Sequence, residues 1–414
     1  MPGFTRNHYV PQWFQYRFLP PGQKGSKFFY LDLHPEVRVS NGYRYKRNSL
    51  MRWGPPRCFC LDDLYTTALG DWKSTEIEEK FFGPIDSRGK AAVEYFSTFT
   101  HPSADGDHFH AMLPYMSIQK IRTPKGLAYL AAITRSAHKN EVLMRMQELQ
   151  RMFCAIWTEC VWSIADASNA STKFILSDHP ITVYNNACFP ASKHFRGCHD
   201  PEIWLTGTHT LFPLSLDKVL ILTNLSWVRD PYGNPLKERP NSNLFRSAMF
   251  KFTDIQTGRL LTDQEVNEIN FIIKSRAYRY IAAGKKEWLF PEEHIGNTRW
   301  DQLGDGYLLM PDPRSVSFGG EIIIGYENRR SDVFDEYGRR PGQHGFKDEQ
   351  RRSKEWDTHL AFQGEFARVF GPKRRGMGFE FGAKHDDTDS PDFHKYHLSL
   401  ERLKPKHARK KARK

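Results

Sequence analysis

The sequence predicts an α+β fold with a helix-rich N-terminal half, a small mixed or antiparallel sheet and an appended C-terminal α/β module. Three observations predict it. Apolar residues repeat at three and four positions along 137–165, β-rich segments follow between 173 and 224, and a capped helical pattern returns from residue 262. We place a core domain at 1–290, the appended module at 291–400 and a basic disordered tail at 401–414.

The opening segment, residues 6–18, reads RNHYVPQWFQYRF and holds five aromatic side chains beside His8 and Pro11. Residues near a chain start fray unless something ties them down, and an aromatic segment is costly to leave in water. We therefore expect this segment to dock on the body of the protein, with His8 carried inward.

Helical signals begin after residue 74. Thr75 and Glu78 have the spacing of a capping box at the start of a helix pair, and residues 101–110 predict a polar loop. Residues 137–165 predict one long amphipathic helix, because these apolar residues share a face: Val142, Met146, Leu149, Phe153, Ile156, Trp157, Cys160 and Ile164. A second capping box, Thr262 and Glu265, opens a helix that we expect to end at Gly284.

The β-rich segments are 173–185, 208–215 and 218–224, and they predict the small sheet. In the appended module, residues 308–330 predict one strand and residues 331–352 a long charged loop. Residues 353–372 predict a helix closed by Gly371 and Pro372.

The formal net charge of +12 is concentrated at one end of the chain, because residues 404–414 hold seven basic side chains and no acid. Such a tail attracts nucleic acid or another acidic surface without reading its sequence, or it only keeps the protein in solution. If it binds nucleic acid, the contacts come from Lys406, Arg409, Lys410, Lys411 and Arg413.

The rest of the composition bounds the class of protein. No apolar run approaches the length of a bilayer span, and the first residues lack the layout of a secretory signal, so we expect a soluble, cytoplasmic protein that binds no membrane. The six cysteines are too few for a disulfide scaffold. A loop at 188–199 contains cysteines and histidines, yet its spacing fits no zinc template. A divalent metal cofactor stays an open alternative.

Four landmarks resemble one bacterial family. They are HYVP at 8–11, SDHP at 177–180, FPLS at 212–215 and NEINFIIKSRAYRYI at 267–281. Together they resemble the domain of unknown function 4238 over about residues 6–283. The family often shows an amide or a small residue where this chain has His179. The resemblance implies a bacterial cytosolic protein and supplies no reaction.

Two landmark residues are candidates for catalysis. Asp178 follows an apolar run, at the end of a predicted strand, where it would bind a metal, orient a base or only close a turn. His8 has the pKa class for proton transfer near neutrality, and pairing with Asp178 would fix its tautomer. We assign substrate binding to Tyr9, His179, Asn267 and Asn270, although the two asparagines also suit a structural clamp.

Two hypotheses of function follow. The first is a nuclease-like hydrolase that acts on nucleic acid or a phosphate ester, with His8 and Asp178 in one cleft. The second is a binding module for nucleic acid or protein, without catalysis, whose landmarks only lock the opening segment in place. Phosphate loops, dinucleotide fingerprints, zincin motifs and nucleophile elbows are absent from the sequence, which disfavours those enzyme classes.

Overall fold

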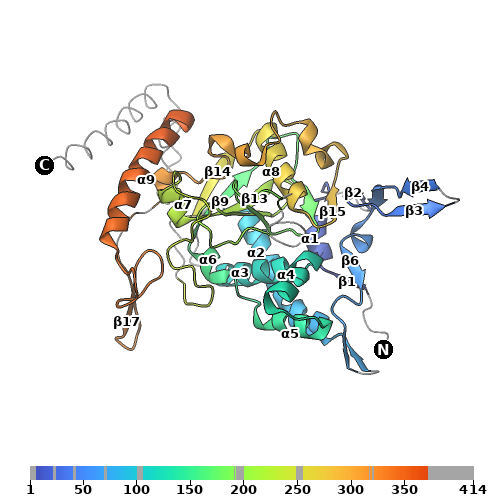
Figure 1. Cartoon of the computed structure of the whole chain (residues 1–414), viewed down its shortest axis with the longest axis horizontal. Helices are drawn as coiled ribbons and strands as arrows, with labels where there is room; N and C mark the ends of the chain where they lie inside the picture. The colour runs from blue at the N-terminus through green and yellow to red at the C-terminus, as the bar shows by residue number, and fades with distance from the viewer. Residues whose placement is uncertain are drawn as a thin grey trace.

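The structure is a computed structural model that describes residues 6–21, 25–40, 43–69, 72–99, 106–190, 192, 200–248, 255–316, 318 and 321–371. Its described elements combine helices with several small sheets, so the predicted α+β class is confirmed. Figure 1 shows the helices of residues 83–158 grouped below the main sheet, with the C-terminal helix on one side. The predicted division into core, module and tail is not tested by this arrangement.

The largest sheet has five strands in the order β11-β12-β13-β9-β14. Their bounds are β9 (Cys160–Asp166), β11 (Thr182–Tyr184), β12 (His209–Pro213), β13 (Lys218–Asn224) and β14 (Ile255–Leu260). Neighbours pair antiparallel except β14, which runs parallel to β9. The predicted strands at 208–215 and 218–224 are confirmed, and their near-continuous burial matches strands covered on both faces.

A second sheet has four strands in the order β10-β15-β2-β5. Its strands are β2 (Phe28–Asp32), β5 (Leu50–Trp53), β10 (Leu176–Ser177) and β15 (Tyr280–Ala283). Two-stranded pairs complete the described strands: β1 (Arg6–His8) with β6 (Cys60–Asp62), β3 (Val37–Ser40) with β4 (Tyr43–Lys46), β7 (Thr67–Leu69) with β8 (Trp72–Ser74), and β16 (Ile322–Gly325) with β17 (Ser331–Phe334).

The described helices are α1 (Gln12–Tyr16), α2 (Gly83–Ser97), α3 (Gly106–Ile121), α4 (Pro124–Thr134), α5 (Lys139–Glu148), α6 (Cys154–Thr158), α7 (Leu225–Arg229), α8 (Asp263–Arg276) and α9 (Glu349–Phe370). A π-helical turn, Ile77–Phe82, leads into α2. The predicted C-terminal helix is confirmed as α9, which ends before Gly371.

The prediction of one helix over 137–165 is wrong. The segment forms α5, a turn, the short α6 and then the central strand β9. The sequence CVWSIA is apolar at nearly every position, and such a run satisfies a helical and a buried-strand pattern equally. Residues 160–166 form a strand because their backbone pairs with β13 on one side and with β14 on the other.

Four smaller predictions also need correction. The second capping box forms as predicted, but α8 ends at Arg276 and residues 280–283 become β15. Thr75 makes no side-chain cap, because the helical turn starts later and Glu78 lies against Asn7 instead. Residues 106–110 belong to α3, and residues 331–334 form β17 within the predicted charged loop.

The opening segment docks as expected. Phe14 and Phe18 are fully buried, and the Phe14 ring stacks on Phe212 of β12 at a centroid distance of 5.3 Å. The Arg17 guanidinium donates to the Leu214 carbonyl at 2.7 Å. In the described part of the chain, no helix combines the length and apolar character that crossing a bilayer requires.

Candidate functional site

Two lysines stand on either side of the junction between α3 and α4. Thr123 caps α4 by accepting a hydrogen bond from the Gly126 backbone N–H at 3.1 Å. Gly126 is required here, because a Cβ atom at this position would collide with the Lys120 carbonyl. The tight junction therefore holds Lys120, in the last turn of α3, close to Lys125, in the first turn of α4.

The turn after β10 brings a histidine to these lysines. The His179 backbone N–H donates to the Ser177 hydroxyl at 3.2 Å, which closes the turn. The His179 ring lies with Nδ1 2.8 Å from the Thr123 hydroxyl. Because that hydroxyl also accepts from Gly126, the cap of α4 and the orientation of the imidazole depend on the same side chain.

Asp200 joins the cluster from the segment before β12. Its carboxylate accepts from Lys120 Nζ at 3.0 Å and from Lys125 Nζ at 2.5 Å. His179 Nε2 lies 3.3 Å from both Lys120 Nζ and Asp200 Oδ2. Lys125 also donates to the Arg276 carbonyl at 2.8 Å, so the end of α8 helps to fix it. We call Lys120, Lys125, His179 and Asp200 the lysine–histidine cluster.

Burial sets the protonation states of this cluster. Burial, with the nearby Lys120 charge, lowers the pKa of His179 to about 3, so the free protein carries a neutral imidazole. Burial also lowers the pKa of Lys125, although Asp200 opposes the shift. Burial alone would raise the pKa of Asp200, but the ammonium groups of Lys125 and Lys120 outweigh it and hold this pKa well below its usual range.

The lysine–histidine cluster forms one wall of a small hollow. The hollow has a cavity volume of about 20 Å³. Its lining comprises Lys120, Lys125, Gly126, Tyr129, Phe153, His179, Asp200, Pro201, Glu202 and Ile203. A water molecule needs about 10 to 15 Å³ and two to four polar partners, so the hollow has room and partners for one. The geometry thus places an ammonium donor, a neutral imidazole and a water-sized space together.

Asp178, predicted as catalytic, is satisfied by backbone groups. Its carboxylate accepts from the N–H groups of Tyr278, Arg279 and Tyr280 at 2.7 to 2.8 Å. Burial raises the pKa of Asp178 to about 6, while these backbone donors act in the opposite direction. The carboxylate therefore ends α8 and starts β15, which explains why the predicted helix stops early.

His8, the other predicted catalytic residue, lies in β1 opposite Cys60. Burial lowers its pKa, and its ring bonds to backbone groups of Pro55 and Pro56. In the described chain no hydrogen bond or ion pair joins His8 to Asp178, and His8 Nε2 is buried without a hydrogen-bond partner. The predicted pair is therefore not assembled by direct contact, and a catalytic role for His8 stays a prediction.

The residues predicted to bind substrate lie in three different places. His179 is on the wall of the hollow. Tyr9 is buried within the opening segment, with its carbonyl accepting from Gln119 at 2.9 Å. Asn270 clamps the backbone just before β10, accepting from Ile175 N–H and donating to the Lys173 carbonyl. Asn267 is buried beside it on α8.

Two sets of predicted residues lie outside the described part of the chain. They are the basic tail, with Lys406, Arg409, Lys410, Lys411 and Arg413, and most of the cysteine- and histidine-containing loop at 188–199. Within the described ranges, no three histidine, cysteine, aspartate or glutamate side chains gather as a metal site would require. In the lysine–histidine cluster the positive charge comes from the ammonium groups of Lys120 and Lys125.

Sequence reasoning missed Lys120, Lys125, Asp200 and Glu202. One signal was available: Lys120 lies among apolar residues in YMSIQKI, where a charged side chain is buried only if it has a partner. Asp200 carries no comparable signal, because it is an ordinary loop residue until the fold brings it to α3. The partner therefore had to be found in the structure.

A second hollow, of about 490 Å³, lies between β14 and α9. Its charged groups pair with one another: Arg314 binds Asp312 at 2.9 Å and Arg259 binds Glu265 at 3.3 Å. None of its described lining residues is a histidine, cysteine or lysine. The described part of this lining therefore offers volume without the proton-transfer groups of the first hollow.

The comparisons with known proteins agree with the landmarks. A model of the family described as protein of unknown function (DUF4238) matches residues 6–287, which is more than half of the sequence. The chain belongs to this family. The match includes every residue of the lysine–histidine cluster and ends before the predicted module. No curated protein and no solved structure matches the chain.

Proposed function

We propose that this protein is a hydrolase of phosphate esters, nucleic acids among them, whose chemistry takes place at the lysine–histidine cluster. The observation that carries the proposal is the neutral His179 ring, with Nε2 3.3 Å from an ammonium group and from a carboxylate on the wall of a water-sized hollow. Phosphoryl transfer needs fixed positive charge where negative charge develops, and a group that takes the proton of the attacking water.

The proposed reaction uses the chain's own side chains. A water held at His179 Nε2 attacks phosphorus, and its proton passes to that nitrogen. The bond from phosphorus to the leaving oxygen breaks, and this oxygen takes a proton from the Lys120 ammonium group. The negative charge of a bound phosphate raises the pKa of His179 from its free value of about 3, so the ring becomes a better base when substrate is present. Lys125 and Asp200 hold both reacting groups in place.

The test is hydrolysis of labelled RNA, labelled DNA and a chromogenic phosphodiester, with and without Mg²⁺ or Mn²⁺. We expect turnover that falls by about 100-fold or more in His179→Asn. Asparagine is polar and smaller than histidine, so the fold should accept the substitution. The matched control is His209→Gln, which removes another buried imidazole whose pKa burial lowers to about 4, on β12 and outside the hollow.

Two results would contradict the proposal. One is wild-type protein that hydrolyses none of the three substrates. The other is His179→Asn retaining full turnover, or losing no more than His209→Gln at equal melting temperature. His8→Ala belongs in the same series, because a loss of activity there at unchanged stability would return the catalytic role to the opening segment.

The competing proposal is a binding module without catalysis, in which the basic tail contacts nucleic acid. A sequence with no disulfide scaffold and no bilayer-length apolar run supports a cytoplasmic location under either proposal. Binding without turnover, lost on deletion of residues 404–414, would favour this alternative and place its contacts in Lys406 to Arg413.

A further inference from the structure

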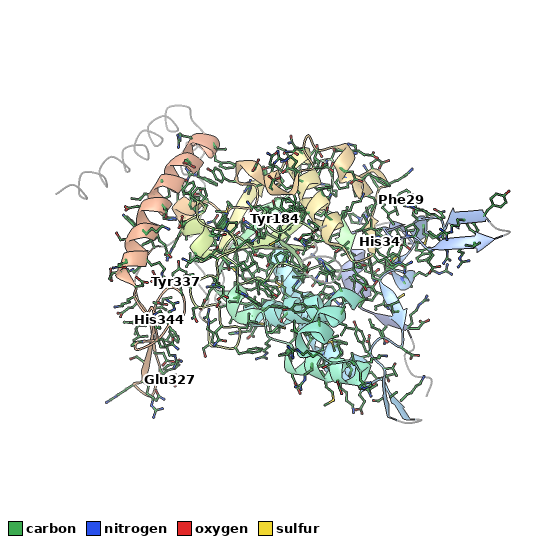
Figure 2. The ribbon with its side chains drawn as sticks, in the orientation of Figure 1. Phe29, His34, Tyr184, Glu327, Tyr337 and His344 are labelled. Atoms are coloured by element: carbon green, nitrogen blue, oxygen red, sulfur yellow. The ribbon has the colours of Figure 1, made fainter. Side chains whose placement is uncertain are left out.

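The β3–β4 hairpin stands out from the body of the protein as a two-stranded ribbon (Figure 1). Its apolar and aromatic side chains are exposed on both faces, with Tyr43 79 % and Val39 66 % exposed. Figure 2 shows side chains standing away from both faces of this ribbon, with His34 near its root. Two strands alone are marginally stable in water, and exposed apolar side chains of this kind mark interaction sites.

The strand register sorts the hairpin side chains into two faces. Val37 lies opposite Lys46 and Val39 opposite Arg44 on one face, while Arg38 lies opposite Tyr45 on the other. Tyr43 shares the face of Tyr45, because residues two apart in a strand point the same way. The two tyrosines are thus about 6.8 Å apart along the strand, roughly twice the 3.4 Å rise between stacked bases.

The hairpin also carries an excess of positive charge. Among the described residues, the carboxylate that pairs with the cations of the hairpin is that of Glu36, against four basic side chains: Arg38, Arg44, Lys46 and Arg47. Glu36 lies at the root and pairs with Arg38 at 3.7 Å and Arg47 at 3.9 Å. Within the described chain, Arg44 and Lys46 have no ion-pair partner. Cations and aromatic rings alternate toward the end of the ribbon, which is the composition of surfaces that hold single-stranded nucleic acid.

We propose that the β3–β4 hairpin binds single-stranded nucleic acid. Tyr43 and Tyr45 stack on bases two steps apart, and Arg44 and Lys46 contact phosphates from the opposite face of the ribbon. A duplex fits this surface less well, since its bases are stacked on one another and cannot reach the tyrosine rings. An acidic protein would satisfy the cations but leaves the two exposed rings unexplained.

The root of the hairpin is connected to the proposed active site. The Arg279 guanidinium binds Asp32, at the end of β2, at 2.8 Å and lies 3.9 Å from Glu36. The Arg279 backbone N–H donates to Asp178, the neighbour of His179. These contacts join the root of the hairpin to the turn that carries His179. That a strand bound by the hairpin is the substrate of the lysine–histidine cluster rests on the proposed function, whereas binding by the hairpin is measured apart from cleavage.

The experiment is a fluorescence anisotropy titration of a 20-nucleotide mixed-sequence oligonucleotide, with full-length protein and with protein lacking residues 404–414. In both backgrounds we expect Tyr43→Ala combined with Tyr45→Ala to weaken single-strand binding about tenfold or more. Arg44→Ala combined with Lys46→Ala should reduce the slope of log affinity against log salt by about 1.4, at about 0.7 per phosphate contact.

The matched control is Ile323→Ala combined with Tyr326→Ala in another exposed hairpin, β16–β17, where these side chains are 63 % and 47 % exposed. Three results would overturn the inference: the tyrosine variant binds as tightly as wild type, the control loses as much affinity, or a duplex of the same sequence binds as tightly as the single strand. Tyrosine-dependent binding with no cleavage of any phosphate ester would leave the hairpin inference standing and remove the proposed function.

Discussion

Asp178 and Asp200 are two carboxylates with little exposed surface, and the charge of Lys125 acts on the pKa of both, yet their surroundings differ. Among the described residues, Asp178 accepts from backbone N–H groups alone, and burial raises its pKa to about 6. Asp200 accepts from two lysine side chains at the edge of a hollow, and those charges lower its pKa. Backbone donors have fixed positions, whereas lysine side chains can exchange one anion for another. The first carboxylate therefore builds the fold and the second can take part in chemistry.

The largest effect should follow from Asp178→Ala. Three backbone N–H groups lose an acceptor that is itself fully buried, so we expect the free energy of unfolding to fall by about 3 to 5 kcal/mol, measured by urea denaturation. The matched control is Asp263→Ala, an exposed carboxylate that accepts from the Thr172 N–H, with an expected loss within about 1 kcal/mol. Equal losses in both variants would remove the structural role given to Asp178.

The next effect should follow from Asp200→Asn. The substitution removes the negative charge that neutralises the two lysine ammonium groups. Because water in the adjoining hollow can solvate these ammonium groups in part, we expect the free energy of unfolding to fall by about 2 to 3 kcal/mol. An added anion should restore some of it. At ten times its dissociation constant, inorganic phosphate would recover about 1.4 kcal/mol. If phosphate stabilises Asp200→Asn no more than Asp178→Asn, the two carboxylates do not differ as we describe.

The pH dependence of the free energy of unfolding should report the titration of His179, the residue next to Asp178 in the sequence. The folded pKa of His179, about 3, lies below its ordinary value of 6.5, so the unfolded chain takes up the proton first as the pH falls. This ring's contribution is therefore complete above about pH 6.5 and is lost toward pH 3. His179→Gln should lower the slope of unfolding free energy against pH by about 1.4 kcal/mol per unit between pH 6 and 4. His34→Gln, an exposed control, should keep the wild-type slope, and parallel curves for His179→Gln would contradict the assignment.

The smallest effect should follow from Tyr129→Phe, at the other side of the hollow. The Tyr129 hydroxyl donates to Glu202 at 3.4 Å, a long hydrogen bond between half-buried groups. We expect the free energy of unfolding to change by no more than about 0.5 kcal/mol. A loss as large as that of Asp200→Asn, measured in the same urea titration, would extend the lysine–histidine cluster to this residue.

The sequence predicts those elements whose signals are local. The Thr262 and Glu265 capping box and the strand at 218–224 each follow from neighbouring residues. Strand β9 was missed because an apolar run has no period of its own, so its pairing with β13 and β14 decides the conformation. Family landmarks located His179 but not its partners.

The candidate site was harder to predict, because its charges pair across the chain. Lys120 and Asp200 are 80 residues apart in the sequence, and the pattern around one residue does not indicate that the other is its partner. For Asp178 the sequence left a catalytic role and a structural role open, for a related reason. Residue type alone does not tell whether a carboxylate points toward solvent or toward the amides of residues 278–280. The hydrogen-bond partners of each buried polar atom distinguish these two orientations.

The stacking of Phe14 on Phe212 has a consequence for synthesis of the protein. The opening segment leaves the ribosome long before the strand that covers it. At about 5 to 20 residues per second, the intervening 198 positions take roughly 10 to 40 seconds to translate. During that interval the early aromatic residues lack their final cover, so the nascent chain presents a binding site for chaperones until β12 emerges.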